Sequence, residues 1–363
     1  MTGMLIATTV GAGIFTLPWI FRSVGWGSAI VLLLALGGLV CFAERSYWKT
    51  LDAVGERHRL VGLAYAKLGK EWGLLAFLGV VGGMLFTLVV YLILASRFMA
   101  VIFPVHGASA LLIFWALAVI PTTFGLRRFA TAENIGIVLK CALIAFVFLA
   151  ASEPLALFRT VPAFAGNPLA AFGAILFALS GWNAIEPMYE LWRGGERRAR
   201  PSSVLLIGGA LVILLYILFS AGIIGSLAGG SSLSPDALSG LVGWPAWKLG
   251  VLAALGLVAL WTAYLPTSLE VEHALAKDLH WNRTLGFALA SLLPLFVVLS
   301  GFTNVIMAVS FAGAIFAGIQ YVIIFALAEK VLRPGRAAAW AMRTAAAVFG
   351  LAALYEVAVF VVH

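Results

Sequence analysis

Residues 8–18 read TTVGAGIFTLP and lie in the middle of an apolar segment that covers residues 4–22. Glycine and proline disfavour a helix interior, since a glycine costs about 1 kcal/mol and a proline about 3 kcal/mol relative to alanine. In lipid, a backbone amide without a hydrogen-bond partner costs several kcal/mol more. We therefore predict that this helix is interrupted and that its freed backbone groups face a ligand.

Residues 177–187 repeat this pattern in a second apolar segment. They read FALSGWNAIEP, so a small polar patch with a glycine again precedes a proline. Interrupted spans at corresponding positions of two halves are typical of inverted-repeat transporters. Close packing of glycines is the alternative for either segment alone. Because both segments show the pattern, five apolar segments apart, we favour two interrupted helices.

The composition of the chain is that of a membrane protein. Of its 363 residues, 63% are hydrophobic and 10% are charged, and the mean hydropathy is +1.08. A soluble domain has about a quarter of its residues charged, so a soluble enzyme, a disordered chain and a disulfide scaffold are excluded. Apolar blocks of about 20 residues are long enough to cross a membrane. We predict an all-α integral membrane protein with about eleven transmembrane helices, at residues 4–22, 26–44, 71–103, 109–125, 132–151, 169–192, 202–228, 245–275, 284–300, 303–328 and 338–362.

The two interrupted segments divide these spans into repeats. The first opens a five-helix repeat over residues 1–151, and the second opens a five-helix repeat over residues 169–328. An odd number of spans per repeat gives the two repeats opposite orientations, as in an inverted repeat. Residues 338–362 form an extra C-terminal transmembrane helix.

The net charge of +8 reflects membrane topology and not a nucleic-acid partner. Eighteen of the 23 lysines and arginines fall on one side of the predicted spans. The positive-inside rule places that side, with the N-terminus, in the cytoplasm, so we expect a multi-pass protein of the cell (inner) membrane that contacts lipids. The two cysteines, Cys41 and Cys141, lie in apolar segments, so neither a disulfide nor a metal site is predicted.

The ends of the half-helices indicate what the two interruptions bind. A helix N-terminus presents unpaired N–H groups and a partial positive charge, so the amides of Gly11, Ala12 and Gly13 suit a carboxylate. Carbonyl groups near Ala7 and at residues 177–179 suit an ammonium group. A carboxylate beside an ammonium group is the head of an α-amino acid, although another polar solute or an ion alone fits the same groups.

These interrupted segments resemble amino acid permeases of the amino acid–polyamine–organocation superfamily. Residues 11–15 with Pro18 resemble the first-helix signature of that family. Residues 180–185 resemble its sixth-helix motif, in which an acidic residue often stands at the position of Asn183. The resemblance implies a LeuT-type fold of five plus five helices and alternating access. It also implies an amino acid bound at mid-membrane between helices 1, 3, 6, 8 and 10.

Other stretches extend the resemblance over nearly the whole chain. Residues 62–65 with residues 68–69 resemble the stretch before the third helix of the family. Residues 8–9 and 300–304 favour its aromatic amino acid permease branch.

Lys140 lies in the inner third of the fifth span, where a charged side chain is costly and marks function by default. In proton-coupled members of the resembled family, a helix 5 lysine stands where sodium sits in sodium-coupled relatives. Thr267 and Ser268 match the hydroxyl pair that ligates sodium in those relatives. Snorkelling of the lysine and back-bonding of the hydroxyls to their own helix are the alternatives. The coupling ion is therefore a proton or Na⁺, and no other cofactor is expected.

The predicted substrate-binding residues belong to the interruptions or to aromatic side chains expected to face them, and they are Thr8, Thr9, Gly11, Ala12, Gly13, Tyr91, Phe177, Ala178, Ser180, Gly181, Trp182 and Tyr264. None of these is acidic, and this favours a neutral, aromatic or branched amino acid over arginine or a polyamine. A face of small residues on the tenth span is expected to pack against the first helix. It consists of Ser310, Gly313, Ala314, Ala317 and Gly318.

We predict a secondary active transporter for a small-molecule amino acid substrate, with proton coupling favoured. A sodium-coupled symporter is the second candidate. A passive channel is less favoured, because a channel does not need paired helix breaks. An enzyme is not expected, because the five histidines lie in loops or near the ends of spans. Symport against exchange, and the oligomeric state, cannot be read from the sequence.

Overall fold

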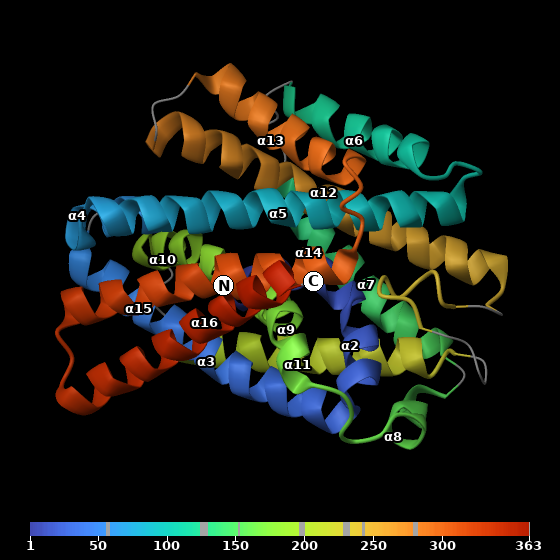
Figure 1. Ribbon diagram of the computed structural model, residues 1–363, viewed down its shortest axis with the longest axis horizontal. Helices are drawn as coiled ribbons and strands as arrows, with labels where there is room; N and C mark the ends of the chain where they lie inside the picture. The colour runs from blue at the N-terminus through green and yellow to red at the C-terminus, as the bar shows by residue number, and fades with distance from the viewer. Residues whose placement is uncertain are drawn as a thin grey trace.

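The computed structural model describes residues 1–55, 59–123, 130–151, 153–195, 200–227, 233–241, 244–278 and 282–362. Every regular element in this described part of the chain is a helix (Figure 1). In chain order the elements are α1 (Thr2–Thr9), η1 (Ala12–Phe15), α2 (Leu17–Val24), α3 (Trp26–Val54), α4 (Leu60–Leu68), α5 (Lys70–Ile102), α6 (Ala108–Thr123), α7 (Ala130–Ala150), η3 (Pro154–Ala156), α8 (Leu157–Thr160), η4 (Pro168–Ala171), α9 (Phe172–Leu179), η5 (Trp182–Ala184), α10 (Ile185–Arg193), α11 (Pro201–Ile224), α12 (Ala246–Asp278), α13 (Arg283–Leu299), α14 (Val305–Ser310), η6 (Phe311–Ala317), α15 (Gly318–Leu332) and α16 (Arg336–Val362).

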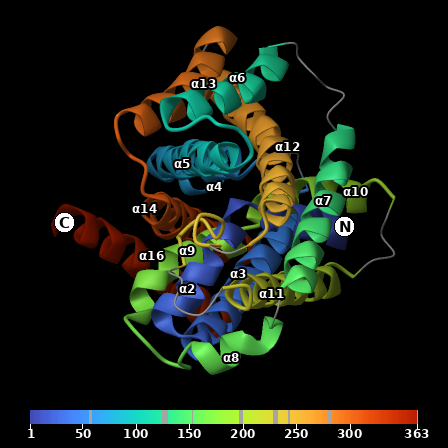
Figure 2. The same ribbon diagram turned by 90° about the vertical axis from the view of Figure 1, so that its right-hand side faces the viewer.

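Membrane-spanning helices dominate the fold. Seven helical stretches of the described residues are long and apolar enough to cross a membrane, and three shorter apolar helices accompany them. Each predicted span after the first overlaps one of these ten stretches. The multi-span helical class is therefore confirmed, while the count of eleven stays a prediction. In the end-on view of Figure 2, α5 lies between the α6–α13 pair and a group formed by α2, α3, α9 and α11.

The first predicted interruption is present in the structure. Helix α1 ends at Thr9, and the backbone then leaves helical geometry at Val10 (φ −75°, ψ 89°) and Gly11 (φ −120°, ψ −147°). One 3₁₀ turn, η1, leads into α2, which has Pro18 in its first turn. Proline is tolerated there because the first N–H groups of a helix lack intrahelical acceptors.

The second predicted interruption is also present. Helix α9 ends at Leu179, and Ser180 (φ −72°, ψ 105°) and Gly181 (φ −126°, ψ 11°) separate it from η5 and α10. Both interruptions therefore consist of two non-helical residues followed by a 3₁₀ turn. We call residues 10–11, together with the helix ends on either side of them (residues 7–13), the first break, and residues 180–181, together with the helix ends on either side of them (residues 178–184), the second break.

The tenth span contains a discontinuity that was not predicted. Its middle, η6, is a π-helix between α14 and α15, a feature that is rare and often marks functional sites. A Cβ built on Gly313 of η6 would lie 1.8 Å from the carbonyl oxygen of Gly173 and 2.7 Å from the amide nitrogen of Phe177. The small face of this span therefore packs on α9 of the sixth span at Ser310, Gly313 and Ala314, while Gly318 meets Phe349 of α16. The expectation that it packs against the first helix was wrong.

The two ends of the molecule differ in how they are closed. At the end that carries α4 and α10, Glu186 accepts hydrogen bonds from the Tyr47 hydroxyl (2.6 Å) and from the amide of Leu60 (2.9 Å). At the opposite end, Arg97 of α5 pairs with Asp236 (3.0 Å), which is 1% exposed in the α11–α12 connection. Burial raises the pKa of Asp236, but hydrogen bonds from Ser234 and Ser239 and the Arg97 charge outweigh burial and leave that pKa below its ordinary value.

Candidate functional site

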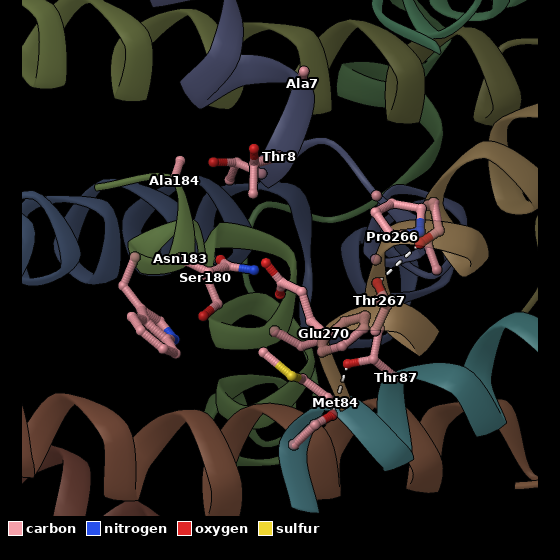
Figure 3. A pocket seen from close by; sticks show the side chains of 18 of the residues that line it. Ala7, Thr8, Met84, Thr87, Ser180, Asn183, Ala184, Pro266, Thr267 and Glu270 are labelled. Carbon is pink, nitrogen blue, oxygen red and sulfur yellow. Dashed lines mark hydrogen bonds between the residues drawn. The ribbon is translucent and has the colours of Figure 1, made fainter. Parts of the chain in front are cut away.

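A central cavity of about 490 Å³ lies between the two breaks. Figure 3 shows side chains from α1, α5, the second break and α12 around it. Nine of the predicted substrate-binding residues and two of the predicted coupling residues line this cavity: Thr8, Thr9, Gly11, Ala12, Gly13, Tyr91, Phe177, Ser180, Trp182, Lys140 and Thr267. Residues far apart in the sequence are thus brought together at one site.

Lys140 of α7 contacts the first break. Its ammonium nitrogen donates a hydrogen bond to the carbonyl oxygen of Ala7 at 2.7 Å. This carbonyl belongs to the last turn of α1, where the helix no longer supplies a donor. The lysine therefore supplies the cation that the end of this half-helix favours.

The amides of the first break are open to a ligand. In the described part of the chain, no hydrogen-bond acceptor is recorded for the N–H groups of Gly11, Ala12 and Gly13. Gly11 and Gly13 also carry no side chain that would cover these groups. Unpaired N–H groups at the start of a helix favour an anion, so this segment can hold a carboxylate that enters the cavity.

Tyr216 of α11 joins the two breaks. Its buried hydroxyl lies 2.9 Å from the carbonyl oxygen of Thr9 and also within hydrogen-bond distance of the carbonyl oxygen of Ala178. A hydroxyl has one proton, so it donates to one of the two carbonyls at a time. Sequence reasoning did not identify this residue, because its partners lie 207 and 38 positions away in the chain.

The second break is bound by aromatic side chains. The indole nitrogen of Trp182 donates to the Gln320 side-chain oxygen at 2.6 Å, and Gln320 in turn donates to the Gly79 carbonyl oxygen at 2.8 Å. The hydroxyl of Tyr321 donates to the Ser180 hydroxyl at 3.3 Å. Gln320 and Tyr321, both from α15, were also not identified from the sequence. They hold the second break against α5 and α15.

Two glycines let the breaks touch. A Cβ on Gly13 would lie 2.7 Å from the Cα of Ala178, and a Cβ on Gly181 would lie 2.2 Å from the Thr9 hydroxyl oxygen. Real Cβ atoms do not approach other atoms so closely, because the interior is already close-packed. Glycine at these two positions is therefore required by contact between the first and second interrupted helices.

Polar side chains of α5 and α12 form the wall opposite the second break. The Tyr91 hydroxyl is hydrogen bonded to the side chain of Thr267. Thr267 donates its own proton to the Ala263 carbonyl oxygen (2.9 Å), and Thr87 donates to the Gly83 carbonyl oxygen (2.8 Å). Figure 3 shows Thr87 of α5 and Pro266 and Thr267 of α12 among the side chains around the cavity. Thr267 therefore hydrogen bonds to the backbone of its own helix, which was the alternative considered for it, and also lines the cavity.

Four of the predicted site residues do not line the cavity: Ala178, Gly181, Tyr264 and Ser268. Ala178 and Gly181 serve the contact between the breaks. Ser268 is buried within the helix packing. Tyr264 is fully buried, its ring meets Phe114 of α6 edge-on at 6.3 Å, and its hydroxyl has no partner in the described part of the chain. It therefore belongs to the packing between α12 and α6 and not to the cavity wall.

A second cavity of about 820 Å³ adjoins the first at the end that carries α4 and α10. The two cavities share wall residues, among them Asn183 and Glu270. Figure 3 shows these two side chains directed toward one another. The predicted site residues include no acidic side chain, so Glu270 is a cavity residue that was not identified from the sequence. It lies near the end of the predicted eighth span, and the sequence alone does not show that α12 brings it to both cavities.

The comparison with sequence families decides what kind of protein carries this site. Residues 1–269 match the family described as "Transmembrane amino acid transporter protein". The chain belongs to this family. As a transmembrane amino acid transporter protein it is a membrane transporter and not an enzyme, and the resemblance to amino acid permeases is confirmed. The aromatic branch stays a prediction. No curated protein sequence matches the chain.

Solved structures of other transporters share the fold of this transmembrane amino acid transporter protein. The manganese transporter of Eremococcus coleocola, in complex with an aromatic bis-isothiourea compound, is 13% identical with a TM-score of 0.68, over 98% of this chain and 85% of that one. A mutant of that transporter gives a TM-score of 0.67 at 13% identity, with the same coverage. Mhp1, a nucleobase-cation-symport-1 family transporter in a closed conformation with bromovinylhydantoin bound, is 14% identical with a TM-score of 0.60, over 90% of this chain and 76% of that one. These likenesses show a LeuT-like transporter fold.

Proposed function

We propose that this protein is a secondary active transporter that moves a neutral, aromatic or branched amino acid across the cell (inner) membrane by alternating access, with proton coupling. The proposed architecture has eleven spans, with inverted five-helix repeats over residues 1–151 and 169–328 and an extra helix over residues 338–362. The N-terminus is cytoplasmic, as the distribution of basic residues predicts. The observation that carries the proposal is the Lys140 ammonium on the Ala7 carbonyl, beside three unpaired backbone amides.

The amino acid would bind with its carboxylate on the amides of residues 11–13, which favour an anion. The carbonyl oxygen of Ala7 already accepts the Lys140 ammonium, and that of Ala178 lies within hydrogen-bond distance of the Tyr216 hydroxyl. The substrate ammonium group would therefore meet the oxygens of Ser180, Asn183 or Glu270, which line the same cavity. Lys140 and Glu270 carry opposite charges when ionised, and a zwitterion without a charged side chain adds no net charge between them.

Proton coupling is supported by the position of Lys140, since a charged lysine holds the end of α1 and a neutral lysine loses most of that attraction. Sodium coupling is the second candidate, because Thr267 lines the cavity and its hydroxyl oxygen suits a hard cation. Ser268, the other hydroxyl of that pair, does not line the cavity. This difference favours the proton.

The test is uptake of labelled L-leucine and L-tryptophan into proteoliposomes under an inward proton gradient or an inward sodium gradient. We expect proton-driven uptake that Lys140→Ala abolishes. Lys248→Ala is the matched control, because Lys248 also donates to a backbone carbonyl (Ala150, 3.2 Å) but lies outside both cavities. Sodium-driven uptake that survives Lys140→Ala would replace the proposal with the sodium symporter.

The substrate is identified by thermal unfolding of the purified protein with each of the common amino acids. A ligand at about a hundredfold excess over its Kd stabilises the folded state by about 2.7 kcal/mol. Stabilisation by a few neutral amino acids is expected. Stabilisation by arginine alone would make Glu270 part of a binding site for a cationic side chain. It would contradict the proposal of a neutral substrate.

A further inference from the structure

Glu44 is a carboxyl group buried beside the breaks that has no part in the substrate site proposed above. Its side chain on α3 is 4% exposed and lines neither cavity. In the part of the chain that the structure describes, no lysine or arginine forms an ion pair with it. A carboxylate buried without a counter-charge is strongly unfavourable, so the packing around Glu44 accommodates the neutral acid.

The Glu44 carboxyl points at the contact between the two interrupted helices. A Cβ on Gly181 would lie 3.3 Å from Glu44 Oε1 and 2.2 Å from Thr9 Oγ1. The carboxyl, the Thr9 hydroxyl and the backbone of the second break therefore converge on the space that Gly181 leaves empty. Any separation of the two breaks must change the surroundings of Glu44.

The hydroxyl groups near Glu44 have already used their protons. Thr9 Oγ1 donates to the Leu5 carbonyl oxygen at 2.8 Å, and the Tyr321 hydroxyl donates to Ser180 Oγ at 3.3 Å. Each hydroxyl has one proton and two lone pairs, so these oxygens face Glu44 as acceptors. A neutral carboxylic acid can donate its O–H to such an acceptor, whereas a carboxylate has no proton to donate to either oxygen.

The titratable groups around Glu44 come from four helices. Cys41 lies one turn away on α3, and Tyr321 of α15 is close enough for an electrostatic interaction with Glu44. One turn further along α3, Tyr47 is hydrogen bonded to Glu186 of α10. Tyr216 of α11 is bound to the carbonyl groups of the breaks. None of these side chains supplies a positive charge that would hold Glu44 ionised.

We propose that Glu44 is a second proton-binding site, which holds its proton while the two breaks are packed together and releases it when they separate. Thr9 and Ser180, on either side of the contact, also line the central cavity. Separation of the breaks would let cavity water reach the carboxyl, and the proton would leave to that water. Proton binding then stabilises the packed arrangement by linkage. The use of this proton in transport rests on the proposed function, but its binding to Glu44 does not.

Infrared spectroscopy of the purified protein tests the site directly. We expect an absorption band of a protonated carboxyl group at neutral pH that is lost in Glu44→Gln. It should persist in Glu356→Gln, which removes a half-buried carboxyl of α16 away from the breaks. Gly181→Ala wedges the contact open while it leaves Glu44 in place, and the band should weaken in this variant. A band that Glu44→Gln leaves unchanged, or that Gly181→Ala does not weaken, would overturn the proposal.

Transport assays test the coupling separately. Exchange of labelled L-leucine or L-tryptophan without a gradient should survive Glu44→Gln, because glutamine imitates the neutral acid. Accumulation under a one-unit pH gradient should fall by about tenfold, the factor that one coupled proton contributes. Unchanged accumulation would contradict the coupling role. If the unmodified protein transports neither amino acid, the proposed function fails, and the infrared result still decides whether Glu44 holds a proton.

Discussion

The first and second breaks have the same backbone plan but different surroundings. The first break meets the Lys140 ammonium and leaves three amides without acceptors. The second break is tied to α15 by Trp182–Gln320 and by Ser180–Tyr321. A charged contact depends on protonation and hydration, whereas buried aromatic hydrogen bonds do not. The difference indicates that the second break is a fixed frame and that the first break is the part that responds to ligand and proton.

Disruption of the contact between the two breaks has the largest expected effect on stability and on amino acid binding. Gly13→Ala places a Cβ 2.7 Å from the Cα of Ala178, which is backbone and cannot move aside. Overpacking of this kind costs about 1–3 kcal/mol, so we expect a lower unfolding temperature and loss of amino acid binding. Gly3→Ala in α1 is the control, because a Cβ there meets no atom within 4 Å. Equal behaviour of the two variants would mean that the breaks do not touch.

Loss of a hydrogen bond that holds the second break against α15 has the next largest expected effect. Trp182→Phe removes the indole N–H and leaves the buried Gln320 oxygen without its donor, which costs about 1–2 kcal/mol. Trp115→Phe also removes an indole hydrogen bond (to the Ser291 carbonyl, 2.9 Å) but lies on α6, outside the breaks. Thermal unfolding should show similar losses for both variants. Amino acid binding should fall only for Trp182→Phe. Equal binding in the two variants would contradict the claim that the Trp182–Gln320 bond fixes the second break for substrate binding.

Tyr216→Phe tests the connection between the two breaks. One hydroxyl shared by two carbonyl groups is lost, and hydrogen bonds between membrane helices contribute about 0.6–1.7 kcal/mol. We expect a modest drop in unfolding temperature and a faster exchange of substrate, because the first break is released from the frame. Tyr355→Phe on α16 is the control, since its hydroxyl accepts one weak bond from Asn167 at 3.4 Å. Slower exchange in Tyr216→Phe would show that the connection promotes movement.

The breaks could be predicted from the sequence because they are local. Glycine, proline and hydroxyl residues within eleven positions of an apolar segment disfavour a helix whatever surrounds it. The partners of the breaks could not be predicted in this way. Tyr216, Gln320 and Tyr321 sit in ordinary apolar helices, and only the packing of those helices brings them to the breaks. Glu270 was not identified for the same reason, since only the packing of α12 brings it to the cavity.

The π-helix of the tenth span shows a further limit. Its small residues are common in any packed membrane helix, so the sequence indicates close packing but not the partner. The structure shows that Gly313 packs on Gly173 and Phe177. The sixth span therefore contacts both the tenth span and the first span. This arrangement explains why the second break has more fixed neighbours than the first.

Tyr91→Phe carries the smallest expected effect on stability and separates the cavity wall from the frame. Its hydroxyl is bonded to Thr267, whose own proton goes to Ala263, so its loss at a cavity surface costs less than about 0.6 kcal/mol. The same hydroxyl lies 3.8 Å from the position of a Cβ on Gly11, close to the unpaired amides. We therefore expect a near-normal unfolding temperature but an amino acid affinity about three- to tenfold weaker, roughly 0.6–1.4 kcal/mol. Tyr65→Phe, outside both cavities, should change neither quantity. Unchanged affinity in Tyr91→Phe would mean that the substrate binds away from the first break. It would then contradict the inference that the first break responds to ligand while the second break is fixed.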